Sequence, residues 1–210
     1  MNQNNGKNSL GLDSIFEDLD NPIDLFKNWF KKAEATEIND PNAFALGTAD
    51  QKNQPSVRMV LLKGLSNEGF VFYTNFNSKK GSDLKTNKLA SVCFHWKSLR
   101  RQVRIIGKVQ QVSENEADKY YNSRPYKNRI SAWASNQSEK LDSRNTFLKQ
   151  IAEFEKKYPD QNKVPRPPHW SGWRILPKEI EFWLDGEGRI HERLNYINNN
   201  GQWKKEILYP

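Results

Sequence analysis

The sequence predicts an α+β fold that consists mainly of antiparallel β-strands, arranged as a barrel or sandwich with flanking helices. Runs rich in β-branched and aromatic residues follow one another over residues 43–112 and again over residues 173–209. Short turns separate most of these runs, which favours antiparallel pairing over a parallel sheet with helical crossovers. Residues 113–158 carry apolar side chains at helical spacing. A chain of 210 residues is long enough for one domain with a sizeable core, which we expect at residues 21–210.

The N-terminal part combines a polar tail with the first helix. Residues 1–20 begin with a stretch of asparagine, glycine, lysine and serine that has little to bury, so we expect a disordered tail. Asn21 is the expected helix cap, because Pro22 suits the first helical position. After this helix, the first strand is expected at residues 43–49.

Residues 56–75 are the most informative stretch of the chain. Two apolar runs flank residues 64–69, which predicts a β-hairpin with a long loop. Arg58 and Lys63 interrupt the first run, and long cations in an apolar strand require an anionic partner, an exposed face or a strand end. Five residues of regular strand span about 16 Å, so these two cations cannot both bind one phosphate group unless the strand is bulged. They either hold two parts of a long ligand or two ligands, or are ordinary strand-end cations.

The following elements are read from caps and periodicity. A helix is expected at residues 78–87, and strands are expected at residues 89–96 and 101–112, with a candidate β-bulge at Gly107. Residues 113–116 form a capping box that begins another helix. The remaining helices are expected at residues 127–134 and 138–158. The remaining strands are expected at residues 173–176, 180–184, 189–197 and 203–209.

The charge balance favours anionic partners. A net charge of +8 and a pI near 9.4 suit nucleic acid, an anionic membrane surface or phosphorylated small molecules. Cys93 is the only cysteine, so no intramolecular disulfide can form, as is usual in a reducing cytosol. The sequence also has no Sec-type signal and no apolar run of the ~20 residues that span a bilayer. We therefore expect a cytoplasmic protein.

Several common kinds of catalytic site are disfavoured by the motifs. His95, His169 and His191 are too far apart in the sequence to form a metal-binding signature, and we expect no metal. The sequence has no G-x-G-x-x-G, no Walker A and no G-x-S-x-G motif. Rossmann dehydrogenases, P-loop enzymes and α/β-hydrolases are therefore poor matches.

A polar cluster near the C-terminus is a candidate site. In the strand expected at residues 189–197, Arg189, His191 and Arg193 point to the same side. Such a face is either a solvent surface or an anion site. Glu181 and Trp183 on the preceding strand could support an anion site.

A third candidate lies in the helical region. Tyr120 and Arg124 are four residues apart and share one face of a helix. Gln137 and Ser138 stand at the expected start of the long helix, where Ser138 can cap the helix and the amides can bind an anion. Simple capping explains the serine equally well.

The order of these motifs resembles the pyridoxamine 5′-phosphate oxidase family. The resemblance extends from about residue 20 to the C-terminus. It rests on RMVLLK at 58–63, FYTN at 72–75, SKK at 78–80, RQVR at 101–104, SRP at 123–125, AWAS at 132–135, QS at 137–138, EFW at 181–183 and RIHER at 189–193.

The resemblance implies an FMN-binding split β-barrel that forms a homodimer, with FMN at the interface and groups from both chains around it. The implied FMN contacts are Arg58, Met59, Val60, Leu61, Leu62, Lys63, Tyr73, Thr74, Lys79, Lys80, Gln102, Gln137, Ser138, Trp183 and Arg193. The implied substrate contacts are Lys63, Tyr120, Arg124, Asn128, Arg189, Ile190 and His191. Lys63, Tyr120 and Arg124 would lie near the substrate phosphate. Arg189 and His191 are the implied catalytic pair beside the pyridine ring.

Two positions depart from the family pattern. Lys79 stands where the family often has arginine, which keeps the charge but loses the bidentate fork. Asn128 stands where a serine commonly helps to hold the substrate phosphate. The asparagine amide can still donate a hydrogen bond, so we expect binding to survive in a weaker form.

The implied reaction oxidises pyridoxamine 5′-phosphate and pyridoxine 5′-phosphate to pyridoxal 5′-phosphate, in vitamin B6 biosynthesis and salvage. Hydride passes to FMN, and O2 then accepts the electrons and gives H2O2, while the amine substrate also releases ammonia. The flavin supplies the electron chemistry, which agrees with the lack of a nucleophile or metal motif.

Two other functions are compatible with parts of the sequence. A flavin reductase or a phenazine-pathway oxidase would share the FMN half, but Tyr120, Arg124, Arg189 and His191 argue against another substrate. A nucleic-acid-binding module would use the positive charge and the aromatic residues for stacking. Against it, the cations are scattered among the strands and no long basic run is present.

Overall fold

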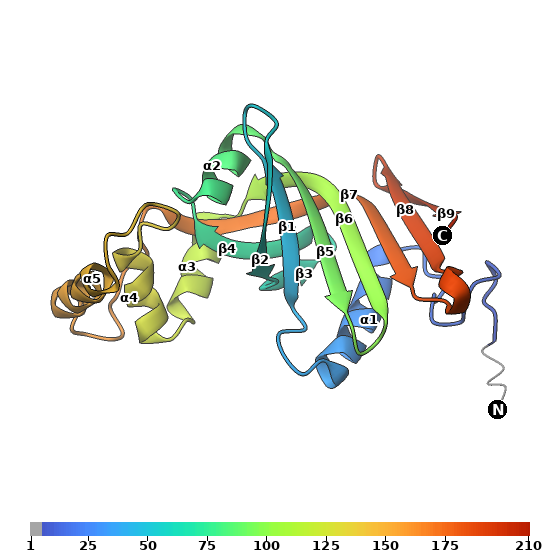
Figure 1. Cartoon of the computed structure of the whole chain (residues 1–210), viewed down its shortest axis with the longest axis horizontal. Helices are drawn as coiled ribbons and strands as arrows, with labels where there is room; N and C mark the ends of the chain where they lie inside the picture. Colours follow the sequence, from blue (N-terminus) through green and yellow to red (C-terminus); the bar gives the residue numbers. More distant parts are fainter. Residues whose placement is uncertain (1–5) are drawn as a thin grey trace.

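The computed structural model describes residues 6–210, which build a curled nine-stranded antiparallel sheet with helices around it (Figure 1). The strands are β1 (Ala43–Ala49), β2 (Pro55–Leu61), β3 (Gly64–Ser66), β4 (Gly69–Asn75), β5 (Leu89–Trp96), β6 (Arg101–Gln111), β7 (Trp170–Leu184), β8 (Glu192–Asn199) and β9 (Gln202–Ile207). The helices are α1 (Pro22–Thr36), α2 (Lys79–Thr86), α3 (Glu114–Asn122), α4 (Tyr126–Ala134) and α5 (Arg144–Lys157), with a 3₁₀ turn η1 at Glu187–Arg189. The predicted fold class, mainly β with flanking helices, is confirmed.

The strand order places β7 at the centre of the architecture. The sheet runs β2-β1-β5-β6-β7-β4-β3, and β8 and β9 extend from β7. Figure 1 shows α3, α4 and α5 at one end of the long axis and β8 and β9 at the other. In the described residues, no helix is both long and apolar enough to cross a membrane.

The main core forms between the sheet and α1. Asn21 caps this helix by accepting from the Ile23 amide, as expected, and the helix buries Phe26 and Trp29 completely. Phe26 meets Phe94 with ring centroids 5.1 Å apart, and Trp29 meets Phe182 at 5.2 Å. Burial of one such side chain stabilises the fold by about 1.5–3 kcal/mol, so this helix anchors the curl of the sheet.

The expected disorder of residues 1–20 is wrong for residues 6–20, which we call the N-terminal strap; residues 1–5 lie outside the described part. Phe16 is fully buried, with its ring 5.4 Å from the Trp29 ring. Trp29 Nε1 donates to the Ile15 carbonyl at 3.0 Å, and Tyr196 Oη donates to the Leu19 carbonyl at 2.8 Å. A few apolar residues are enough to order this polar stretch, because they pack against the folded core.

The predicted hairpin between residues 56–63 and 70–75 is also wrong. Strand β2 pairs with β1, with Arg58 opposite Leu46, and forms an edge of the sheet. Strand β4 pairs instead with the short β3 and with β7. Strand periodicity shows which side chains share a face but not which strand lies alongside. The pairing partner of β2 therefore could not be identified from its nearest neighbour in the sequence.

Two further element boundaries differ from expectation. The long helix begins at Arg144 with Ser143 as its cap, and Ser138 lies in the preceding loop with φ +79°. The strand expected from residue 189 begins at Glu192, because η1 and the φ of +63° at Arg189 turn the chain first. Arg189, His191 and Arg193 therefore do not share one strand face.

Strand β7 joins the two strands expected at residues 173–176 and 180–184. The pairing of β6 with β7 shifts register between Ile106 and Gly107, which confirms the predicted bulge. A Cβ atom at Gly107 would lie 2.2 Å from the Leu176 carbonyl oxygen, so no other residue fits there without movement. The irregularity accommodates Pro177, which cannot donate to the ladder.

Candidate functional site

A cavity of about 570 Å³ opens where β2, β4, α3 and α4 meet. Many of the residues singled out in the sequence line it, namely Met59, Val60, Leu61, Lys63, Tyr73, Thr74, Lys80, Tyr120, Arg124 and Gln137. Residues that were not predicted as ligand contacts complete the lining, namely Asn75, Ser131, Ala132, Ser135, Phe147 and Trp170. Strands β2 and β4 supply apolar and small polar groups, whereas the cations come from the segment after β2 (Lys63), from α2 (Lys80) and from the turn after α3 (Arg124).

Stacked aromatic rings form one wall of the cavity. The rings of Tyr73 and Tyr120 are 4.0 Å apart and nearly parallel, and the Tyr73 ring lies 5.4 Å from the Trp170 ring. Burial raises the pKa of Tyr73 to about 12, and the nearby Glu116 carboxylate adds to the shift. Tyr73 is therefore a neutral phenol at physiological pH.

Arg124 lies against this aromatic wall, and part of its guanidinium group has no hydrogen-bond partner in the described residues. Its guanidinium carbon lies 4.7 Å from the centre of the Trp170 ring, a cation–π geometry. Burial lowers the pKa of Arg124, and its Nη1 is buried without a hydrogen-bond partner in the described residues. Such an arginine is suited to binding an anion that enters the cavity.

Lys80 supplies a second cation at the other side of the cavity. Its Nζ donates to Gln137 Oε1 at 2.8 Å and to Ser78 Oγ at 3.2 Å. Burial, together with the smaller effect of the nearby Arg58 charge, lowers the pKa of Lys80 to about 8. Neither partner is an anion, so this ammonium group also has the environment of an anion-binding cation.

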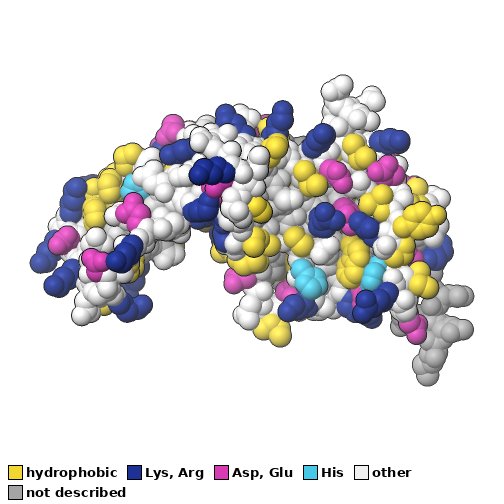
Figure 2. Space-filling view, turned by 45° about the horizontal axis from the view of Figure 1, so that its top comes forward, with side chains coloured by type: hydrophobic (Ala, Val, Ile, Leu, Met, Phe, Trp, Pro, Cys, Tyr) yellow, Lys and Arg dark blue, Asp and Glu magenta, His cyan; other side chains and the backbone are white. Residues whose placement is uncertain are grey.

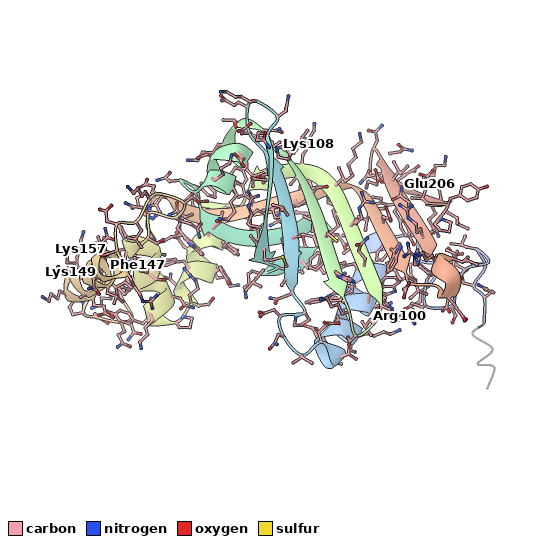
Figure 3. The ribbon with its side chains drawn as sticks, viewed as in Figure 1. Arg100, Lys108, Phe147, Lys149, Lys157 and Glu206 are labelled. Carbon is pink, nitrogen blue, oxygen red and sulfur yellow. The ribbon has the colours of Figure 1, made fainter. Side chains whose placement is uncertain are left out.

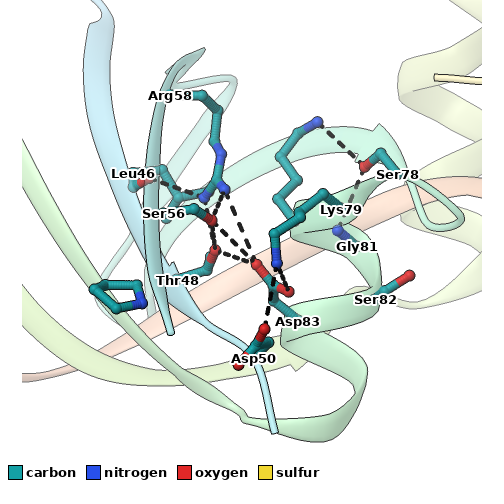
Figure 4. A network of polar contacts seen from close by, with 12 residues as sticks. Leu46, Thr48, Asp50, Ser56, Arg58, Ser78, Lys79, Gly81, Ser82 and Asp83 are labelled. Atoms are coloured by element: carbon teal, nitrogen blue, oxygen red, sulfur yellow. Dashed lines mark hydrogen bonds and ion pairs between the residues drawn. The ribbon is translucent and has the colours of Figure 1, made fainter. Parts of the chain in front are cut away.

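Arg58 is not among the cavity-lining residues; it lies in a polar network that ties β1, β2 and α2 together (Figure 4). Its Nη1 donates to Thr48 Oγ1 at 2.7 Å and to the Leu46 carbonyl at 3.1 Å, and its Nη2 also donates to Ser56. Asp83, which is buried, lies 4.0 Å away. Burial lowers the pKa of Arg58, and Asp83 opposes the shift.

Lys79 belongs to the same network rather than to the lining. Its Nζ lies 3.2 Å from Asp83 and 3.6 Å from Asp50 (Figure 4). The buried Asp83 thus links Arg58 and Lys79, which fixes the start of α2 relative to the edge strand. No motif in the sequence indicated this role, because Asp83 lies inside a helix pattern that is mostly polar.

Another group of predicted residues forms a second cluster, the C-terminal cluster, composed of Gln102, Trp183, Arg189, His191 and Arg193. Trp183 lies opposite Gln102 on β6 and opposite Arg193 on β8. The Trp183 and His191 rings have centroids 4.7 Å apart. Arg193 Nε donates to Glu181 Oε1 at 2.9 Å, and Arg104 Nη1 donates to Glu181 Oε2 at 3.0 Å.

The cavity and the C-terminal cluster lie far apart in one chain. Trp170, at the start of β7, lines the cavity, whereas Trp183 is near its end. The 15 residues of this strand span roughly 45 Å along the backbone. In Figure 3, Phe147 of the cavity lining and Arg100, which contacts the turn that carries the C-terminal cluster, lie toward opposite ends of the long axis.

The remaining predicted residues do not line the cavity. Leu62 is buried in the core, and Ser138 lies in the loop before α5. Asn128 is exposed on α4, and Ile190 is 72 % exposed beside the C-terminal cluster. Ser131 on α4 and Ser135 at its C-terminal cap lie one and two turns beyond Asn128, and this helical spacing is a signal that could have identified them.

Comparisons with known proteins agree with this arrangement. Residues 30–158 match the family model described as pyridoxamine 5′-phosphate oxidase. Residues 170–210 match the model described as the pyridoxine 5′-phosphate oxidase C-terminal dimerisation region. The chain is 59 % identical over 207 residues to the pyridoxine/pyridoxamine 5′-phosphate oxidase of Pelagibacter ubique, covering 98 % of this chain and 100 % of the relative. The corresponding Agrobacterium fabrum protein is 52 % identical over 199 residues, covering 94 % and 96 %.

Solved structures show the same fold. The PhzG protein from Burkholderia lata, in complex with tetrahydrophenazine-1-carboxylic acid, superimposes with a TM-score of 0.88 at 30 % identity, covering 98 % of this chain and 100 % of that chain. A pyridoxamine 5′-phosphate oxidase-related, FMN-binding protein from Nostoc punctiforme gives a TM-score of 0.70 at 17 % identity, covering 88 % and 96 %. The predicted split-barrel class is thus confirmed, and the chain belongs to the pyridoxamine 5′-phosphate oxidase family.

Proposed function

We propose that this protein oxidises pyridoxamine 5′-phosphate and pyridoxine 5′-phosphate to pyridoxal 5′-phosphate, with FMN as cofactor and O2 as electron acceptor. The observation that carries the proposal is the cavity, in which the half-buried cations Lys80 and Arg124 flank a wall of stacked aromatic rings. The relatives named as pyridoxine/pyridoxamine 5′-phosphate oxidases support the substrate class. In this proposal H2O2 is formed, and ammonia is released from the amine substrate.

The residues around Lys80 fit the phosphate end of FMN. The lowered pKa of Lys80, about 8, reflects a desolvated cation beside Arg58, and a phosphate would stabilise both charges. Ser78 caps α2, so the first amides of this helix lie next to the same ammonium group. Thr74 and Gln137 add polar groups to the lining. When bound, FMN would supply the hydride acceptor and deliver the electrons to O2.

The C-terminal cluster would complete the site from a second copy of the chain. Gln102, Trp183 and Arg193 are too far from the cavity along β7 to reach one ligand within the same chain. The match of residues 170–210 to a dimerisation region supports a homodimer. Each of two equivalent sites would then combine the cavity of one chain with the C-terminal cluster of the other.

Positioning is the main contribution of the chain to the reaction in this proposal. Lys63, Tyr120 and Arg124 would bind the substrate phosphate, and the unpartnered Nη1 of Arg124 would donate to it. Arg189 and His191 would hold the pyridine ring. Fixing the substrate at both ends orients the carbon that is oxidised and removes much of the entropic cost of reaction.

The scattered surface charge argues for a small anionic ligand over a nucleic acid. Figure 2 shows lysine and arginine side chains spread along the whole visible face, with acidic side chains among them. A groove that follows a nucleic-acid backbone would instead gather its cations into a continuous stripe.

The visible spectrum of the purified protein tests the proposal. A flavin band that bleaches when pyridoxamine 5′-phosphate is added without O2, and returns with O2, is the expected result. Pyridoxal 5′-phosphate formation is measured in parallel. Turnover of tetrahydrophenazine-1-carboxylic acid but not of the phosphorylated substrates would point to the activity class of the PhzG protein instead.

A further inference from the structure

Asp185, the residue directly after β7, contacts the ring of His191. Its Oδ1 lies 3.1 Å from His191 Nδ1. No sequence motif indicated Asp185, because it stands in a turn between two predicted strands. The contact places a carboxylate beside the ring nitrogen nearest the backbone, and the partner of one ring nitrogen influences which nitrogen carries the proton.

Arg100 fixes the other oxygen of the same carboxylate. Arg100 Nε donates to Asp185 Oδ2 at 2.7 Å, and Nη2 donates to the same oxygen. The Asp185 amide in turn donates to the Arg100 carbonyl at 3.0 Å. Arg100 itself has φ +54° in the turn between β5 and β6, so two turns are locked together. Asp185 therefore has little freedom to leave His191.

The imidazole is held from two further sides. The Trp183 ring lies 4.7 Å from it, at an interplanar angle of 41°. The Gly186 amide donates a hydrogen bond to Nδ1 at 3.2 Å. A Cβ atom at Gly186 would lie 1.9 Å from the Ile190 carbonyl oxygen, so the turn that presents this amide tolerates only glycine.

Nδ1 of His191 thus faces both an acceptor and a donor, which correspond to opposite tautomers. If Nδ1 carries the proton, it donates to Asp185, and Nε2 is an unprotonated acceptor. If Nδ1 is unprotonated, it accepts from Gly186, and Nε2 carries the proton. A hydrogen bond to an ionised carboxylate is about twice as strong as one between neutral groups, which favours the first arrangement.

We propose that Asp185, held by Arg100, is a positioning residue that keeps the proton of His191 on Nδ1 and leaves Nε2 as an acceptor toward the substrate. The inference rests on the proposed function, in which His191 lies beside the pyridine ring. An acceptor at Nε2 can receive a hydrogen bond from the amine or hydroxyl on the carbon that is oxidised. Asp185 does not itself touch the substrate.

Nitrogen NMR of the histidine side chains tests the tautomer directly. The chain has only 3 histidines, so ¹⁵N-labelled imidazoles give few signals, and His191→Asn identifies those of His191. At about pH 8, where an ordinary imidazole is neutral, the holoenzyme should show a protonated Nδ1 and an unprotonated Nε2 on His191. Asp185→Ala should move the proton toward Nε2, because the Gly186 amide becomes the nearest partner.

Steady-state kinetics on the same variants link the tautomer to turnover. Asp185→Ala should lower kcat by about tenfold to a hundredfold, because the oriented acceptor beside the reacting carbon is lost, with flavin content and KM little changed. Asp185→Asn, whose amide oxygen can still accept from Nδ1–H, should recover part of kcat and of the tautomer. Glu68→Gln, which removes a surface carboxylate from its ion pair with Arg174, is the matched control and should alter neither.

An Nε2-protonated His191 in the wild-type protein would overturn the inference, as would an unchanged tautomer and kcat in Asp185→Ala. Circular dichroism and size-exclusion chromatography check that the variants fold, and Asp185→Asn keeps the test available if the alanine variant does not. The NMR measurement needs no turnover. Failure of the proposed oxidase activity is therefore distinguishable from failure of this inference.

Discussion

Lys80 is a cation whose environment disfavours its charge. Its pKa of about 8 lies below the ordinary value of 10.5, mainly because of burial. Between these two values the folded chain binds fewer protons at this site than the unfolded chain, so the contribution of Lys80 to stability rises with pH across that window. An anion beside the ammonium group would reverse the shift and raise the pKa again.

Binding of FMN should therefore take up protons in alkaline solution. At about pH 9, Lys80 is mostly neutral in the free protein and becomes charged when a phosphate binds, so we expect uptake of close to one proton. Titration calorimetry in two buffers with different ionisation enthalpies measures this number. Lys80→Met should abolish the uptake, whereas Lys85→Met, an exposed lysine at the other end of α2, should keep it. Equal heats in both buffers for the wild-type protein would contradict the assignment.

Arg189 should affect turnover but not flavin content. It lies in the turn of the C-terminal cluster with φ +63°, and the proposed role is to hold the pyridine ring. We expect Arg189→Ala to lower kcat/KM about a hundredfold, because misplacement of the reacting carbon by about 1 Å has an effect of this size. The flavin absorbance per chain is the internal control. Near-normal turnover would count against this role.

At the scale of the element, the N-terminal strap is held by both packing and charge. Lys7 Nζ contacts Glu192 Oε1 at 2.7 Å, and the Asp13 amide donates to Glu192 Oε2 at 2.6 Å. Lys205 Nζ contacts Asp18 at 2.6 Å. Glu192 is the residue between His191 and Arg193, so the strap supports the strand end that carries the C-terminal cluster.

Removal of one strap side chain distinguishes a packed strap from a disordered tail. Phe16 is fully buried against Trp29, so Phe16→Ala should lower the free energy of unfolding by about 3–5 kcal/mol. Ile38→Ala, at a residue that is 95 % exposed, should change it by less than about 0.5 kcal/mol. Urea unfolding followed by tryptophan fluorescence gives both values. A disordered tail would make the two variants indistinguishable.

At the scale of the whole molecule, the proposed site draws on two groups of residues that one chain does not bring together. Strand β7 carries one end into the cavity and the other into the C-terminal cluster, and no turn brings these ends together. The edge strand β2 exposes apolar side chains beside the cavity, with Val57 71 % and Met59 63 % exposed. An exposed apolar stripe next to an incomplete site suits contact with a second copy.

Complementation between inactive variants tests the shared site. Arg124→Ala impairs the cavity and Arg189→Ala impairs the C-terminal cluster, so each homodimer should have two defective sites. Co-expression should restore about a quarter of wild-type activity, because half of the dimers are mixed and each mixed dimer has one intact site. Co-expression of Arg124→Ala with Lys63→Ala, which impair the same cavity, should restore none. Equal recovery in both mixtures would contradict a site built from two chains.

The sequence by itself determined the classes of element and most of the cavity lining. The Pro22 helix, the β1 strand and the Gly107 bulge were predicted correctly, because proline geometry, side-chain alternation and the close approach of a glycine are properties of local sequence. Ordered motifs also identified cavity residues such as Tyr73 and Arg124.

Only the tertiary structure decided which elements lie next to each other. The pairing of β2 with β1 and the order of the strap depend on partners distant in the sequence, and periodicity does not encode these partners. The contact between Arg100 and Asp185 joins residues 85 positions apart, and it exists only because the start of β6 lies beside the end of β7. The environment of His191 therefore follows from packing, since each local segment is compatible with several arrangements and the shared core selects one.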